Sequence, residues 1–134
     1  MPHRPPFVPD PRHSFLASRW FSFKAALAGI AYILRTQPNA WIELTAAAVA
    51  VVAGLTIGLQ RLEWALLGTA ICLVLALEAV NTAIETVVDL VSPEAHPLAK
   101  IAKDTAAGAL IFAVLGSLIV AAAIFGPQIL AIFG

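Results

Sequence analysis

Three long apolar runs, separated by two short polar breaks, constrain the fold more than any other feature of the sequence. The runs cover residues 41–59, 64–77 and 105–125. An α-helix needs about 17–25 mostly apolar residues to cross the hydrocarbon core of a bilayer. The hydrophobic share of 60% is also well above the 45–50% typical of soluble domains. We therefore expect an all-α membrane protein with spans at about 41–60, 63–91 and 101–126.

The middle run continues into a segment whose polar residues share one side of a helix. These residues form the polar stripe, which consists of Glu78, Asn81, Glu85 and Asp89. At 100° per residue they fall within an arc of about 80°, and the stripe extends about 16 Å along the axis. Charged groups at membrane depth are costly, so they generally mark a function. The stripe should run from the edge of the hydrocarbon to the headgroups or the aqueous phase.

The N-terminal part of the chain has a different character. Residues 1–13 are rich in proline and lack the apolar region of a signal peptide, so we expect a disordered tail. Residues 14–36 mix arginine and lysine with aromatic and aliphatic side chains. They predict an amphipathic helix that lies along the membrane surface, although an ordinary helix packed on its neighbours would also fit. We take 14–134 as one membrane domain.

The distribution of positive charge predicts the topology. With three spans, the N-terminal region and the loop at 92–100 lie on the same side of the membrane. Of the eight lysines and arginines, only Arg61 falls on the other side. Cytosolic segments carry the excess of positive charge, so we expect the N-terminus and the 92–100 loop to be cytosolic.

The formal net charge is zero, and no nucleic-acid partner is expected. The single cysteine, Cys72, excludes an intrachain disulfide.

The polar stripe would suit phosphoryl transfer to a lipid. Glu85 is a hard oxygen ligand for Mg²⁺, and Glu78, at the depth of a lipid hydroxyl, suits the proton acceptor. Asn81 would orient Glu78 or a substrate oxygen, while Lys103 and Asp104 would meet phosphate and a metal or a ribose. Interhelical hydrogen bonding or an ion or proton path would also place polar groups here. No GxxxxGK[ST] or GxGxxG motif is present, so the residues alone leave these functions open.

A longer motif surrounds the stripe and resembles the signature of the small prokaryotic diacylglycerol kinase family, which includes undecaprenol kinases. It reads Glu78-x-x-Asn81-Thr82-Ala83-x-Glu85-x-x-x-Asp89, then Ser92-Pro93-Glu94-x-His96-Pro97-Leu98-Ala99-Lys100-x-Ala102-Lys103-Asp104. The resemblance extends from about Lys24 to the third span. Both prolines of the second part are expected to end helices. The residues of the second part are more similar to those of the undecaprenol kinase branch.

The resemblance implies a homotrimer in the bacterial inner membrane that phosphorylates a lipid alcohol with ATP and Mg²⁺. It implies that Glu78 is the proton acceptor, that Glu85 binds the metal and that Asn81 lies beside the reacting hydroxyl. It assigns further residues to the two substrates: nucleotide contacts at Glu85, Glu94, His96, Lys103 and Asp104, and a lipid pocket at Glu43, Trp41 and Glu78. Asp89 matches an acidic position to which no distinct role is attached.

Two positions depart from the family pattern. Gln37 stands where members commonly carry a second metal-binding glutamate, so an uncharged amide would complete or weaken that metal site. A nucleotide-contacting arginine aligns with Ser18, and we expect the adjacent Arg19 to replace it. The choice between diacylglycerol and undecaprenol stays open, as do a cation- or proton-conducting protein and a catalytically inactive relative.

Overall fold

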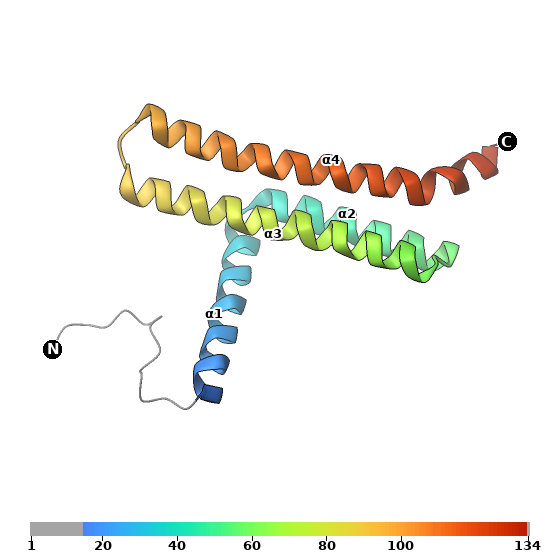
Figure 1. Ribbon diagram of the computed structural model, residues 1–134, viewed down its shortest axis with the longest axis horizontal. Coiled ribbons are helices and arrows are strands. Elements are labelled where there is room, and N and C mark those ends of the chain that lie inside the picture. Colours follow the sequence, from blue (N-terminus) through green and yellow to red (C-terminus); the bar gives the residue numbers. More distant parts are fainter. Residues whose placement is uncertain (1–14, 134) are drawn as a thin grey trace. The chain divides into compact units, whose positions relative to one another are not determined.

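The computed structural model describes residues 15–133, and this part of the chain is helical with no strands. The helices are α1 (Phe15–Thr36), α2 (Pro38–Ile57), α3 (Arg61–Val91) and α4 (Pro97–Phe133) (Figure 1). Three of them, α2, α3 and α4, are long and apolar enough to cross a membrane. The expected all-α fold with three spanning helices is therefore confirmed. The disordered tail expected at 1–13 lies outside the described residues.

The chain divides after Thr36 into two units, and α1 makes up the described part of the first. None of its residues is buried within the structure, and Trp20 and Phe23 stack with their ring centroids 5.8 Å apart. Two cations lie over aromatic rings, with Lys24 over Trp20 and Arg19 over Phe15. Basic and aromatic side chains thus contact one another on this exposed helix, and its position along the membrane surface stays a prediction.

Glycine makes the connection between α2 and α3 tight. Gly58 ends α2 in the left-handed conformation (φ 80°), and the N–H groups of Gly58 and Leu59 both donate to the carbonyl of Gly54. A Cβ on Gly54 would lie 2.8 Å from a Leu59 methyl carbon and 2.9 Å from the Trp64 ring. The missing side chain of Gly54 lets the aromatic ring at the start of α3 pack directly against α2, and any larger residue would displace Leu59 or Trp64.

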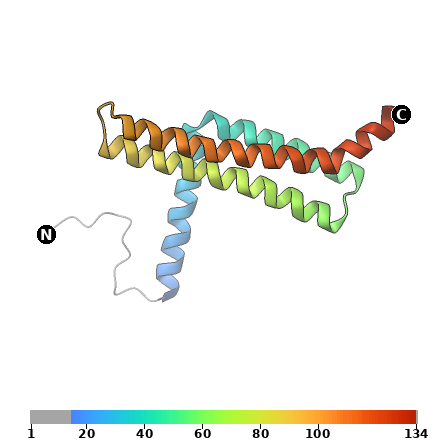
Figure 2. The same ribbon diagram turned by 45° about the horizontal axis from the view of Figure 1, so that its top comes forward.

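Proline marks the start of α4 rather than the end of a helix. We expected Pro93 and Pro97 both to end helices, and for Pro97 this expectation is wrong. Pro97 is the first residue of α4, where its missing N–H has no helical partner to lose. Pro127 lies inside α4, and Figures 1 and 2 show the helix changing direction near that point.

The second unit is built around α3, which packs along α4 and contacts α2. Its core is small and consists mainly of alanine and aliphatic side chains: Ala40, Leu67, Ala70, Val74, Ala106, Ala113 and Ile124. Most large apolar side chains face outward, as expected of helices that meet lipid or other helices. Figures 1 and 2 show the joined ends of α3 and α4 projecting beyond the start of α2. The outer end of the polar stripe, Asp89, lies in the last turn of α3.

Candidate active site

The polar stripe runs from the interior of the bundle to its surface. Glu78 is only 2% exposed and is the largest fully buried side chain among the described residues. Asn81 is also buried and Glu85 is half-buried, whereas the Asp89 side chain is 67% exposed. The stripe therefore faces neighbouring helices at its deep end and the surroundings at its outer end. A stripe facing lipid would instead have been exposed along its whole length.

Hydrogen bonds order the middle of the stripe and leave its deep end unsatisfied. Asn81 donates from Nδ2 to Oε1 of Glu85 at 3.2 Å, so two stripe residues on successive turns are connected. The Oε2 atom of Glu78 and the Oδ1 atom of Asn81 are buried, and neither has a hydrogen-bond partner within the described chain. Buried polar groups normally have partners, so these two unsatisfied oxygens set the deep end of the stripe apart from an ordinary helix interface.

A second carboxylate approaches the deep end from α2. The Glu43 side chain is half-buried, its Oε2 atom also lacks a partner within the described residues, and its charge interacts with that of Glu78. The charge of Glu78 also interacts with that of Glu85. Helix packing therefore brings two predicted site residues, 43 and 78, within range of a charge interaction although they are distant in the sequence. The predicted lipid residue Trp41 is largely exposed on α2.

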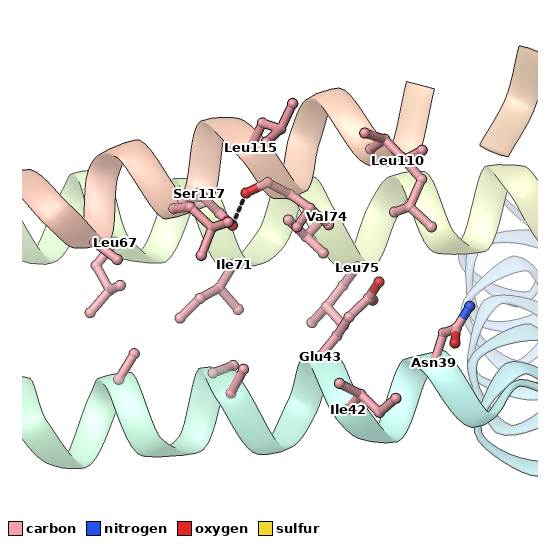
Figure 3. A pocket seen from close by; sticks show the side chains of 18 residues that line it. Asn39, Ile42, Glu43, Leu67, Ile71, Val74, Leu75, Leu110, Leu115 and Ser117 are labelled. Carbon is pink, nitrogen blue, oxygen red and sulfur yellow. Dashed lines mark hydrogen bonds between the residues drawn. The ribbon is translucent and has the colours of Figure 1, made fainter. Parts of the chain in front are cut away.

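An apolar groove with a volume of about 480 Å³ lies between α2, α3 and α4 and reaches Glu43. Figure 3 shows Glu43 and Asn39 projecting into it from α2, opposite aliphatic side chains of α3 and α4. Trp41 is not among its lining residues. Sequence reasoning missed Asn39 and Ser117, which are polar lining residues on α2 and α4. An amide one turn before Glu43 and a serine in the middle of the third apolar run were the available signals.

A second cavity, the loop pocket, lies where the α3–α4 connection leaves the bundle and has a volume of about 550 Å³. Its charged and titratable lining residues are Asp89, Glu94, His96, Lys100 and Lys103. Three of the predicted nucleotide contacts, 94, 96 and 103, are thus brought together. Two others, Glu85 and Asp104, do not line the pocket, and Asp104 forms an ion pair with Lys100 one turn earlier on α4.

His96 has a structural role that the sequence analysis did not assign. Its Nδ1 atom accepts a hydrogen bond of 3.2 Å from the Leu98 N–H, and its carbonyl accepts one from the Lys100 N–H. These bonds cap the first turn of α4. Nδ1 is therefore engaged as an acceptor, which leaves Nε2 as the atom that can meet a ligand in the loop pocket.

The two departures from the family pattern, Gln37 and Ser18, belong to different units of the chain, and Arg19 is the expected substitute for the arginine missing at Ser18. Gln37 is the half-buried, extended residue immediately before α2. Arg19 lies on α1 in the other unit, where its guanidinium stacks over Phe15. Within residues 15–133, no three histidine, cysteine or acidic side chains cluster closely enough to hold a metal by themselves. A divalent cation here would therefore need additional ligands, such as the phosphates of a substrate.

Comparison with known proteins identifies the family. The profile of the prokaryotic diacylglycerol kinases matches residues 24–125. A diacylglycerol kinase of Synechocystis is 40% identical over 112 residues, which cover 83% of this chain and 64% of that protein. An undecaprenol kinase of Bacillus subtilis is 41% identical over 114 residues, covering 84% of this chain and 92% of that protein. A diacylglycerol kinase of Sinorhizobium is 42% identical over 62 residues, covering 46% and 45% of the two chains.

The matched region contains α2, α3 and most of α4, and therefore both ends of the polar stripe, the apolar groove and the loop pocket. The chain belongs to the prokaryotic diacylglycerol kinase family.

Proposed function

We propose that this protein is a membrane lipid kinase that transfers the γ-phosphoryl group of ATP to the hydroxyl of a lipid alcohol. The lipid oxygen attacks phosphorus, the bond from phosphorus to the β–γ bridging oxygen breaks, and ADP leaves. The observation that carries the proposal is the continuity of the polar stripe on α3. It connects Glu78, whose charge interacts with that of the groove residue Glu43, to Asp89 in the loop pocket. One helix thus connects an apolar groove with a polar pocket, as a lipid and a nucleotide require.

Glu78 is the proposed acceptor of the hydroxyl proton. Its burial and its unpartnered Oε2 atom suit a carboxylate that forms its hydrogen bond only when substrate arrives. Asn81, whose Oδ1 atom also lacks a partner within the described chain, would hold the hydroxyl beside Glu78. Its Nδ2 bond to Glu85 would connect the residue beside the reacting hydroxyl to the carboxylate proposed to bind the metal near the phosphates.

The nucleotide would occupy the loop pocket. The Lys103 ammonium lies closest to the stripe, because it bonds to Asp89 and its charge also interacts with that of Glu85. We assign Lys103 to the phosphates and Glu94 and His96 to other polar groups of the nucleotide, with Nε2 as the histidine atom in contact. Asp104 and Arg19 are further proposed contacts, each of which would first leave its present partner.

The donors present fit magnesium delivered with the nucleotide. Mg²⁺ in kinases is usually held by one or two carboxylates together with substrate phosphates, so a protein cage of three acidic residues is not needed. Glu85 would supply the carboxylate and Gln37 a neutral amide oxygen, with Mg²⁺ neutralising phosphate charge when bound. The Asn81 bond to Oε1 of Glu85 leaves Oε2 for this purpose.

The lipid chain would lie in the apolar groove with its hydroxyl near Glu43 and Glu78. The names of the similar proteins supply two candidate substrates, diacylglycerol and undecaprenol. Trp41, exposed on the same helix as Glu43, would contact the lipid outside the groove. We further propose a homotrimer in the prokaryotic inner membrane, with the N-terminus and the 92–100 loop in the cytosol. The outward apolar faces of the three spans and the positive charge on these segments support this arrangement.

The test is a phosphoryl-transfer assay with two lipids. The full chain, purified in detergent, receives Mg²⁺ and γ-labelled ATP with either diacylglycerol or undecaprenol in mixed micelles. We expect label in the lipid fraction with at least one alcohol and its loss when EDTA removes Mg²⁺. Transfer to neither lipid would contradict the proposal. Cation or proton flux into liposomes without ATP would favour a conducting protein instead.

A further inference from the structure

An ion pair crosses from α3 to α4 at the loop pocket. The Lys103 Nζ atom on α4 donates to Oδ1 of Asp89 on α3 at 2.8 Å. Asp89 lies one helical turn beyond Glu85, whose charge also interacts with that of Lys103. The ammonium group therefore contacts one carboxylate of the polar stripe and lies within charge-interaction range of the carboxylate one turn earlier.

The other lysine of the loop pocket is paired differently. Lys100 bonds to Asp104 within α4, at the spacing of neighbouring turns. Such a pair orders side chains on one helix but fixes nothing between helices. The pair of Asp89 and Lys103 joins residues 14 apart in the sequence and holds the lysine relative to the stripe. Only this second pair controls the position of a cation relative to Glu85.

We propose that Asp89 is a positioning residue, which acts on phosphoryl transfer by holding the Lys103 ammonium beside the stripe. The proposal rests on the lipid kinase function and on the contact of Lys103 with the phosphates. A lysine side chain has a flexible four-carbon stem and many conformations, so a fixed partner restricts where its charge lies. When Asp89 holds the Lys103 ammonium, this positive charge contacts the transferring phosphoryl group close to Glu85.

Positioning predicts opposite effects on turnover and on nucleotide binding. The carboxylate of Asp89 lies in the loop pocket, so its negative charge also repels a bound triphosphate. Asp89→Asn removes that repulsion and releases Lys103. We expect kcat to fall about 3- to 10-fold, the scale of a partly exposed ion pair of this kind, while KM for Mg·ATP stays unchanged or decreases. Asp89→Glu, which keeps the charge on a longer stem, should recover part of kcat.

The test compares these variants in the full-length protein with and without Lys103. In the Lys103→Met background, Asp89→Asn should change kcat by less than about 1.5-fold, because a residue that acts through Lys103 has no effect once Lys103 is absent. Glu63→Gln is the matched control: it makes the same chemical change at the other end of α3, where the new amide oxygen can still accept the Gln60 N–H bond. Its kcat should equal that of the wild type.

A second measurement does not depend on activity. Labelling by an amine-reactive reagent, followed by mass spectrometry, compares Lys103 with Lys100 as an internal reference. An ion-paired ammonium reacts slowly, so Asp89→Asn should raise the Lys103:Lys100 labelling ratio about 3-fold or more. An unchanged ratio, or a wild-type kcat in Asp89→Asn, would overturn the proposal, as would an equal loss of kcat in the Lys103→Met background. A wild-type protein that phosphorylates neither lipid would instead contradict the function on which the proposal rests.

Discussion

Replacing Glu78 by glutamine separates a catalytic carboxylate from a structural one. The substitution keeps the size and shape of the side chain and removes its charge and its capacity to accept a proton. Glu78 is 2% exposed, its Oε2 atom has no partner within the described chain, and its charge interacts with those of Glu43 and Glu85. Burial of this carboxylate therefore lowers the stability of the folded protein, which indicates that the residue is kept for a function.

The two effects of Glu78→Gln have opposite signs. Loss of a general base lowers turnover by about 10²- to 10⁴-fold, which is about 2.7–5.4 kcal/mol of transition-state stabilisation. A buried polar group without a partner costs about 1–3 kcal/mol, and more when it is charged. We therefore expect the variant to be nearly inactive and at least as stable as the wild type, with its melting temperature unchanged or raised by several degrees.

Two measurements on the same purified protein check this prediction. Transfer of label from ATP to the lipid alcohol gives kcat, and thermal unfolding in detergent gives the melting temperature, with Glu63→Gln as the control for both. Turnover within tenfold of the wild type would remove Glu78 from the role of proton acceptor. A clear fall in melting temperature would mean that the carboxylate mainly holds the helices together, the interpretation that the sequence alone left open.

Three further substitutions test other parts of the structure. Gly54→Ala should lower the free energy of unfolding by about 1–3 kcal/mol, because the new Cβ would lie under 3 Å from Leu59 and Trp64. Thermal unfolding measures this change, and Gly68→Ala, which has open space around its new Cβ, is the control. Ala50→Phe should fill the apolar groove and raise KM for the lipid alcohol at least tenfold, while KM for Mg·ATP stays constant. Equal changes in the two KM values would argue against a lipid in the groove. His96→Asn should keep the cap of α4 and raise KM for Mg·ATP, whereas His96→Ala should also cost about 1 kcal/mol of stability; equal melting temperatures of the two variants would contradict the capping role.

The sequence predicted the elements well because their signals are local. Span length and hydropathy depend only on consecutive residues, and the 100° helical repeat places Glu78, Asn81 and Glu85 on one face whatever lies opposite. The start of α4 was misjudged, since a proline stops a preceding helix or begins a following one according to its position. The imidazole of His96 and the missing N–H of Pro97 together favour a helix start at that point.

The candidate site contains features that local sequence signals cannot predict. The sequence by itself determined an all-α chain with three apolar helices and an ordered row of polar groups on the middle one, because periodicity and hydropathy act along the chain. Only the tertiary structure decided that Glu78 is buried within charge-interaction range of Glu43, that the groove opens between three helices and that Asp89 bonds to Lys103. These contacts join residues on different helices, and their geometry depends on how side chains fill the space between those helices, which no pattern within a single helix encodes.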